Sequence, residues 1–149
     1  MKSTRHSLRR LSTIDFNPYQ RGTFNDNLWS GGIVPYTFDN NVTPENVQLM
    51  RDAMDRWENV ANVHFVFFQD PPSDYVHIQR HDTVNNSAVG RQGGQQIINI
   101  ANWDAPFVMA HELGHCLGFW HEQSRTDRHD HLIVHLENVC QNCSRDSDD

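Results

Sequence analysis

Three histidines, a glutamate and a glycine stand close together in the stretch HELGHCLGFWH, at positions 111 to 121. On a helix, positions four apart lie on one face, so His111 and His115 can direct ring nitrogens at one metal ion. Glu112 lies beside them, where a carboxylate can act as general base on a metal-held water. Gly118 can adopt the left-handed conformation that ends a helix, so that His121 returns as a third ligand. Three ligands with an open fourth position are typical of a catalytic zinc site.

A purely structural interpretation of the same stretch is an amphipathic helix whose two histidines have no chemical role. That alternative leaves the glycine and the third histidine unexplained, so the zinc site is the stronger hypothesis. The sequence also marks the helix that must carry the site. Asp104 is a candidate N-cap, Pro106 fits the first turn and Gly118 ends the helix. The apolar positions of this helix are Phe107, Val108, Ala110, Leu113 and Leu117.

Length and composition favour one globular domain. The chain has 149 residues and a net charge of −7, which disfavours nucleic acid as a partner. No apolar run approaches the roughly 18 residues of a transmembrane helix. The mean hydropathy is −0.70. Residues 1–10 are basic but lack the apolar stretch of a secretory signal, so we expect residues 1–27 to form an irregular arm. A targeting or nucleic-acid-binding arm is the alternative for the first ten residues.

The three cysteines do not define a disulfide framework. Cys116 stands between the candidate zinc ligands, and Cys140 and Cys143 form a single C-x-x-C near the end. A zinc ribbon needs a second such pair, and a thioredoxin-like site needs a strand-to-helix setting. The pair is therefore interpreted as a local disulfide or as free thiols. Residues 140–149 are expected to form a polar, acidic tail.

The remaining pattern predicts a second helix and about five strands. A strand at residues 33–38 contains Pro35, which favours an edge position. Thr43 and Pro44 begin a helix. Its core-facing stripe is Val47, Met50, Met54, Trp57 and Val60 or Ala61. Further strand material is expected at residues 63–68, 75–79, 88–89, 96–100 and 132–136. Because helices and strands are segregated along the chain, the predicted fold class is α+β.

The sequence after the third histidine carries a further motif. It reads HEQSRTDR at positions 121–128, which resembles the H-E-x-x-R-x-D-R motif of the astacin branch of the metzincin zinc peptidases. Two upstream segments are also similar to that family: LWSGGIVPY at residues 28–36, like the start of the mature enzyme, and VGRQGG at residues 89–94. The resemblance covers residues 28–139, which we interpret as one astacin-like metallopeptidase domain.

The resemblance implies a zincin-like fold, with a mixed, twisted sheet of about five strands packed with two helices. It also implies that His111, His115 and His121 bind one zinc ion and that Glu112 is the general base. The protein would be a zinc metalloendopeptidase that hydrolyses peptide bonds with a metal-activated water. Family resemblance further implies secretion.

Other features of the family are only partly matched. In family members the residue that matches Glu122 pairs with the buried amino terminus of the activated enzyme, so we expect a processing point near Arg21. No segment matches the family's methionine-bearing turn beneath the metal, its metal-side tyrosine or its disulfide cysteines, and His129 replaces an aspartate.

Other histidine pairs do not predict a second metal site. His77 with His81, and His131 with His135, are four residues apart on predicted strands, where that spacing spans about 13 Å. The expected partner is a protein or peptide substrate, extended along an edge strand near residues 87–90, with a monomer as the default state. The alternative function is a zinc-binding form without catalytic activity that binds peptides or partners. It is considered because no segment is recognised that matches the part of the family's domain that forms the lower wall of the cleft.

Overall fold

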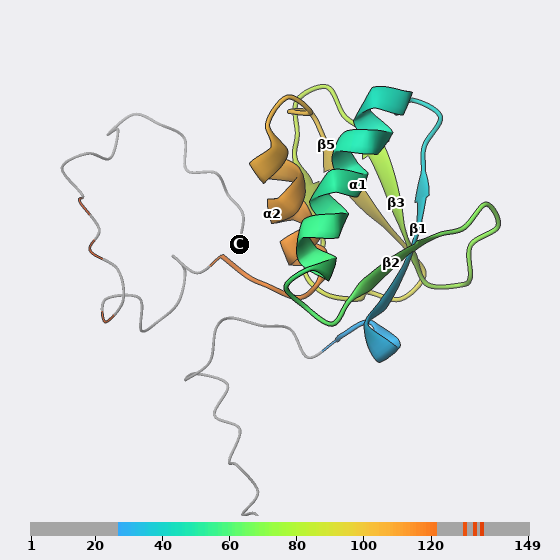
Figure 1. Cartoon of the computed structure of the whole chain (residues 1–149), viewed down its shortest axis with the longest axis horizontal. Coiled ribbons are helices and arrows are strands. Elements are labelled where there is room, and N and C mark those ends of the chain that lie inside the picture. The colour runs from blue at the N-terminus through green and yellow to red at the C-terminus, as the bar shows by residue number, and fades with distance from the viewer. Residues whose placement is uncertain (1–26, 122–129, 131–132, 134, 136–149) are drawn as a thin grey trace, which may run out of the picture.

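The computed structural model describes residues 27–121, 130, 133 and 135. Its elements are η1 (Ser30–Gly32), β1 (Ile33–Phe38), α1 (Pro44–Glu58), β2 (His64–Phe67), β3 (Tyr75–Arg80), β4 (Asn86–Ser87), β5 (Gln95–Ile100) and α2 (Pro106–Cys116), as Figure 1 shows. The prediction of an α+β fold with two helices and about five strands is confirmed for this part of the chain. The strand expected at residues 132–136 falls largely outside the described residues. Arg21, Glu122, His129, Cys140 and Cys143 lie outside them as well.

The strands form one mixed sheet in the order β2-β1-β3-β5-β4. Neighbouring strands are parallel from β2 to β5, and β4 runs antiparallel to β5. The short strand β4 is therefore one edge of the sheet and β2 is the other.

The expectation that the first strand lies at an edge is wrong, because β1 lies between β2 and β3. The backbone explains how the sheet accommodates Pro35. The N–H of Phe68 donates to the C=O of Tyr36 at 3.0 Å, so the N–H and C=O of Tyr36 point toward β2, and the backbone N and C=O of Pro35 point toward β3. Pairing with β3 begins only at Tyr36, so the N–H that Pro35 lacks falls before that ladder.

Helix α1 begins as the sequence predicts. The side chain of Thr43 accepts a hydrogen bond from the N–H of Asn46 at 3.3 Å, and Pro44 is the first helical residue. The predicted stripe is buried at Met50 and Met54 and half-buried at Trp57. It stops there. The N–H groups of residues 60 and 61 both donate to the C=O of Trp57 and turn the chain out of the helix, so Val60 is 78% exposed.

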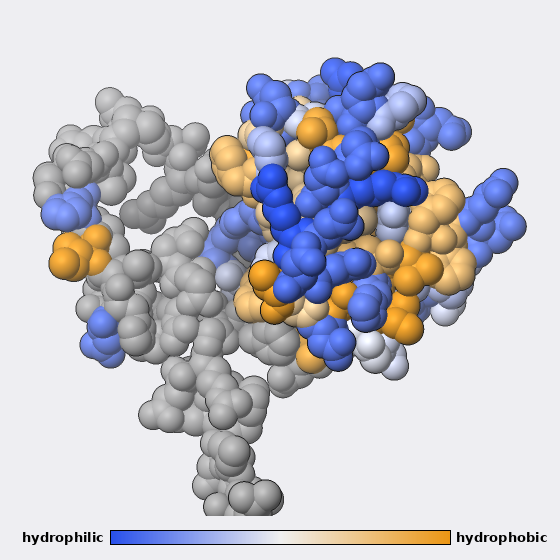
Figure 2. Space-filling model, in the orientation of Figure 1, coloured by the Kyte–Doolittle hydropathy of each residue, from blue (hydrophilic) through white to orange (hydrophobic). Residues whose placement is uncertain are grey.

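The core lies between one face of the sheet and both helices, which cover the same face (Figure 1). Alternate residues of the three central strands point into it, as expected for strands with one covered face. The buried strand residues are Val34, Tyr36, Val76, Ile78, Gln96, Ile98 and Ile100. Met109 and Leu113 of α2 also belong to the core. In Figure 2 the outward side of α1 is hydrophilic, and hydrophobic residues lie beside it. No helix among the described residues is long and apolar enough to cross a membrane.

Candidate metal centre

Helix α2 carries the HELGH sequence and starts at Pro106. The predicted N-cap at Asp104 is wrong: the cap residue is Ala105, and its side chain makes no capping hydrogen bond. The reason is the proline itself, because the residue before a proline is driven into an extended conformation, which is the conformation that a cap residue needs. Ala105 has φ −111° and ψ 92°.

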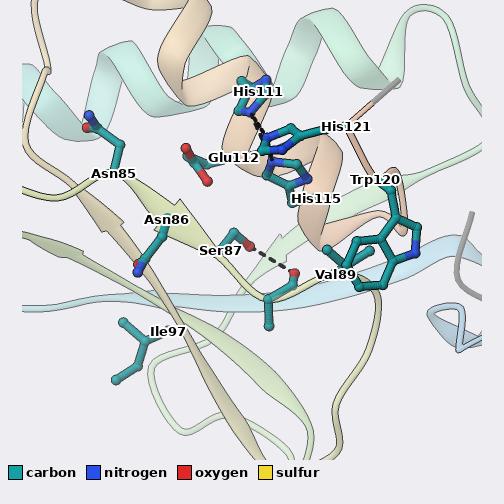
Figure 3. A pocket seen from close by; sticks show the side chains of 11 residues that line it. Asn85, Asn86, Ser87, Val89, Ile97, His111, Glu112, His115, Trp120 and His121 are labelled. Atoms are coloured by element: carbon teal, nitrogen blue, oxygen red, sulfur yellow. Dashed lines mark hydrogen bonds between the residues drawn. The ribbon is translucent and has the colours of Figure 1, made fainter. Parts of the chain in front are cut away.

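The end of α2 agrees with the prediction. Gly118 has a φ of +110°, a value that only glycine adopts readily, and its N–H donates to the C=O of His115 at 2.8 Å. The chain reverses at this point, and His121 comes back to the face of the helix that carries His111 and His115 (Figure 3).

Trp57 fixes α2 against α1 directly behind the site. Its indole N–H donates to the C=O of Ala110 at 2.9 Å, next to His111 in the chain. Its ring packs so closely against α2 that a Cβ on Gly114 would lie 3.2 Å from it. It also stacks on Phe119, with ring centroids 5.6 Å apart. The predicted core role of Trp57 therefore extends to positioning the candidate ligands.

The three predicted ligands converge in the structure. The Nε2 atoms of His111 and His115 are 2.9 Å apart, and that of His121 lies 3.1 Å from each of them. In Figure 3 the three rings meet at one place. The described part of the chain holds no second cluster of three side chains that can bind a metal.

The donor geometry fits a tetrahedral metal ion. Ligand nitrogens about 2.05 Å from a zinc ion at tetrahedral angles lie about 3.4 Å from one another, a few tenths of an ångström more than observed. One tautomer is also set: Nδ1 of His115 lies 2.7 Å from the C=O of Phe119, which can only accept, so Nδ1 carries the proton. The neutral ring then presents the lone pair of Nε2 to the metal position.

Burial and the charges of the neighbouring His115 and His121 hold the pKa of His111 below its usual value. Burial removes water from the imidazolium, and the two rings nearby repel its positive charge. Both effects favour the neutral form that a metal ligand needs.

A cleft of about 410 Å³ opens on the three histidines. Glu112 lies in its wall, is only 5% exposed and directs its carboxylate into the same space (Figure 3). The opposite wall is the edge of the sheet. The cleft is lined by Asn85, Asn86, Ser87, Ala88, Val89, Ile97, His111, Glu112, His115, Trp120 and His121.

The edge strand of this wall is displaced by two residues from its predicted place. Strand material was expected at residues 88–89, but β4 is Asn86–Ser87. Gly90 does not take part in the pairing with β5, because its N–H donates to the C=O of His115 at 2.8 Å. The segment after β4 is thus tied to α2 instead of continuing along β5.

The sequence did not identify Trp120, Asn85 or Asn86 as cleft residues. Trp120 is next to His121, and this adjacency is the signal that points to it. Nothing in the pattern marks the two asparagines, because their place depends on how β4 pairs with β5. His77 and His81 are not among the residues that line the cleft. His77 contacts Thr37 and Asp39, and Nδ1 of His81 accepts from two backbone N–H groups.

Comparison with known proteins agrees with this geometry. A family model described as "Astacin", a peptidase family, matches residues 22–148. A solved structure, high choriolytic enzyme 1, a hatching enzyme zinc-protease from Oryzias latipes (medaka fish), superposes with a TM-score of 0.65 at 28% sequence identity. That match covers 80% of this chain and 60% of the hatching enzyme chain.

Two curated relatives show the same similarity over a small part of their own length. Human Tolloid-like protein 2 is 36% identical over 115 residues, which are 76% of this chain and 11% of the relative. The zinc metalloproteinase nas-14 of Caenorhabditis elegans is 36% identical over 121 residues, which are 78% of this chain and 24% of the relative. The chain thus spans about a tenth to a quarter of these proteins.

Proposed function

Because the chain belongs to the astacin family of peptidases, we propose that it is a zinc-dependent endopeptidase with His111, His115 and His121 as the zinc ligands and Glu112 as the general base. The sequence-based resemblance to the astacin branch is confirmed, and this family is one of zinc-dependent peptidases. The observation that carries the residue assignment is the convergence of three Nε2 atoms, within 3.1 Å of one another, beside a buried carboxylate.

Zinc, when bound, acidifies a water molecule and polarises the scissile carbonyl. Glu112 stands at the wall of the cleft next to the ligands, so its carboxylate accepts the proton of the attacking water. The same carboxyl group then donates that proton to the nitrogen of the leaving amine. Low exposure of Glu112 supports this shuttle, because a carboxylate shielded from bulk water keeps the proton within the site.

The substrate is an extended stretch of protein or peptide along residues 86–89. These residues include the edge strand β4, whose outer side has no neighbouring strand in the described sheet. An extended chain can add to such an edge through main-chain hydrogen bonds. Apart from the histidines and Glu112, the described lining is uncharged, so we expect uncharged substrate side chains to be favoured on this side of the cleft.

The decisive experiment uses Glu112→Ala with Glu45→Ala as matched control, since Glu45 is exposed in the first turn of α1. Glu112→Ala is expected to retain one zinc ion per chain and to lose about 10²- to 10⁴-fold in peptide hydrolysis. Glu45→Ala is expected to match the wild type in both. Chelation is expected to abolish hydrolysis, and added zinc is expected to restore it. Full activity of Glu112→Ala refutes the assignment.

The second candidate is a zinc-binding module that holds peptides without cutting them. The observation behind it is that the match covers 60% of the hatching enzyme chain, so the similarity extends to part of that protein and its catalytic activity is not carried over by the match alone. Stoichiometric zinc and measurable peptide binding, with no turnover that chelation removes, favour this candidate.

The proposal also includes secretion of the protein and cleavage of its amino-terminal segment. We propose secretion because the chain belongs to this family, and removal of the segment up to about Arg21 would create the amino terminus that family members bury against the residue matching Glu122. Sequencing the amino terminus of active material tests this, and full activity of a chain that retains Met1 contradicts it. The domain is proposed to span residues 28–139, with one zinc ion and a monomeric state.

A further inference from the structure

Two polar or charged side chains among the described residues are buried: Glu112 in the metal centre and Gln96 in β5, each 5% exposed. Gln96 takes an inward position between apolar neighbours of the sheet, where a polar side chain needs hydrogen-bond partners. Its partners lie in the loop that joins the edge strand of the cleft to β5.

Both ends of the Gln96 amide are used. Nε2 of Gln96 donates to the C=O of Gly90 at 3.1 Å, and Oε1 accepts from the N–H of Gln92 at 3.1 Å. The N–H of Gly90 donates to the C=O of His115 at 2.8 Å. A continuous chain of hydrogen bonds therefore runs from the core strand through Gly90 to the helix that carries the candidate zinc ligands.

This chain joins the two walls of the cleft. Residues 87–89 line one wall and directly precede Gly90, whereas His111 and His115 line the other. Because the N–H of Gly90 bonds to α2 and its C=O bonds to Gln96 of the sheet, the position of Gly90 sets the offset between the sheet edge and α2. A substrate that pairs with the edge must place its scissile bond at the metal, so this offset decides the alignment.

The requirement is specific to glutamine. The loop turns a carbonyl and an N–H into the core, and one amide side chain supplies the matching donor and acceptor. A carboxylate at this position keeps the acceptor but opposes one oxygen to the C=O of Gly90. An apolar side chain leaves both loop groups without their partner.

We propose that Gln96 is a positioning residue, which holds residues 87–90 against the metal-site helix and thereby aligns extended substrates. It contacts no substrate itself, and the inference rests on the proposed peptidase function. The chain provides a matched control in Gln95, the preceding residue, which is exposed and accepts from the Tyr75 hydroxyl at 3.0 Å.

The test compares wild type, Gln96→Met, Gln96→Glu and Gln95→Met as zinc-loaded full chains. Steady-state kinetics on a long peptide that spans the cleft are set beside a short chromogenic amide, and hydrogen exchange of residues 87–92 is measured in parallel. For Gln96→Met we expect the KM of the long peptide to rise about tenfold, with kcat and the short substrate within about threefold of wild type. Exchange at Gly90 is expected to be about tenfold faster.

Gln96→Glu is expected to resemble Gln96→Met, because the donor to Gly90 is the group that positions the wall, and it serves as the test if Gln96→Met does not fold. Gln95→Met is expected to match the wild type. Unchanged exchange at Gly90, or equal losses on both substrates together with lost zinc, overturns the inference. If the wild type does not cut the peptide, the proposed function fails. The dissociation constant of the uncut peptide then replaces KM, with the same tenfold expectation.

Discussion

Two adjacent glycines before β1 allow a sharp test of the packing between β1 and the loop that follows α1. Gly31 and Gly32 have φ values of +63° and +73°, so alanine at either position pays for a left-handed conformation, about 1 kcal/mol. A Cβ on Gly31 meets nothing within 4 Å, whereas a Cβ on Gly32 would lie 2.3 Å from the backbone oxygen of Asn62. That oxygen belongs to main chain and cannot rotate away, so β1 and the loop must separate.

We expect Gly31→Ala to lower the free energy of unfolding by about 1 kcal/mol and Gly32→Ala by about 3 kcal/mol, since overpacking adds roughly 1–3 kcal/mol. The difference of about 2 kcal/mol is about 30-fold in the unfolding equilibrium constant. Urea unfolding followed by tryptophan fluorescence, at one zinc concentration for all variants, measures both losses. The same loss in the two variants would show that residue 62 does not approach Gly32, and the reasoning would fail.

Three further predictions concern the core and the helix of the metal centre. Burial raises the pKa of the Cys116 thiol from its usual 9.0 to about 12. The folded pKa lies above the unfolded one, so the stability this group contributes is present below pH 9 and is lost as the pH rises toward 12. Between pH 8 and 11 the thermal unfolding temperature should fall less steeply for Cys116→Val than for the wild type. Met50→Ala should lower the free energy of unfolding by about 2–5 kcal/mol, because Met50 is fully buried, and Val60→Ala at an exposed site should change it by less than about 0.5 kcal/mol in the same urea titration. Trp57→Phe removes the hydrogen bond to Ala110 and should cost about 1 kcal/mol. It should also weaken zinc binding in a chelator competition assay.

Local signals in the sequence predicted the two helices and the convergence of the three histidines well. The start of α1 is set by Thr43 and Pro44, the start of α2 by Pro106, and the end of α2 by Gly118. Each of these residues acts on backbone groups only a few positions away. The three histidines fall within eleven positions, and helix geometry together with one glycine is enough to bring them together. Such features depend little on the rest of the fold, so they can be predicted before the fold is known.

Sheet order could not be predicted in the same way. Pro35 suggested an edge, but whether a missing N–H matters depends on which neighbour that residue faces and where the pairing begins. Both are properties of the assembled sheet. The two-residue extent of β4 has the same origin, because the N–H of Gly90 donates to the C=O of His115 and does not pair with the backbone of β5. Residues 25 positions apart carry no local sequence pattern that predicts such a contact.

Gln96 shows how a residue of this second kind can be recognised once the fold is known. In the sequence it begins the strand expected at residues 96–100, and in the structure its side chain is buried on the same face of β5 as Ile98 and Ile100. An inward glutamine there conflicts with an apolar core. The structure resolves the conflict, since the amide bonds to the loop that forms one wall of the cleft. Burial of a polar side chain costs desolvation free energy, and hydrogen bonds must offset that cost. The groups that form those hydrogen bonds therefore indicate the role of the side chain. Here the hydrogen bonds lead from Gln96 in β5 through Gly90 to His115. The buried residue that does not fit the apolar core is therefore the one that connects the core to the cleft.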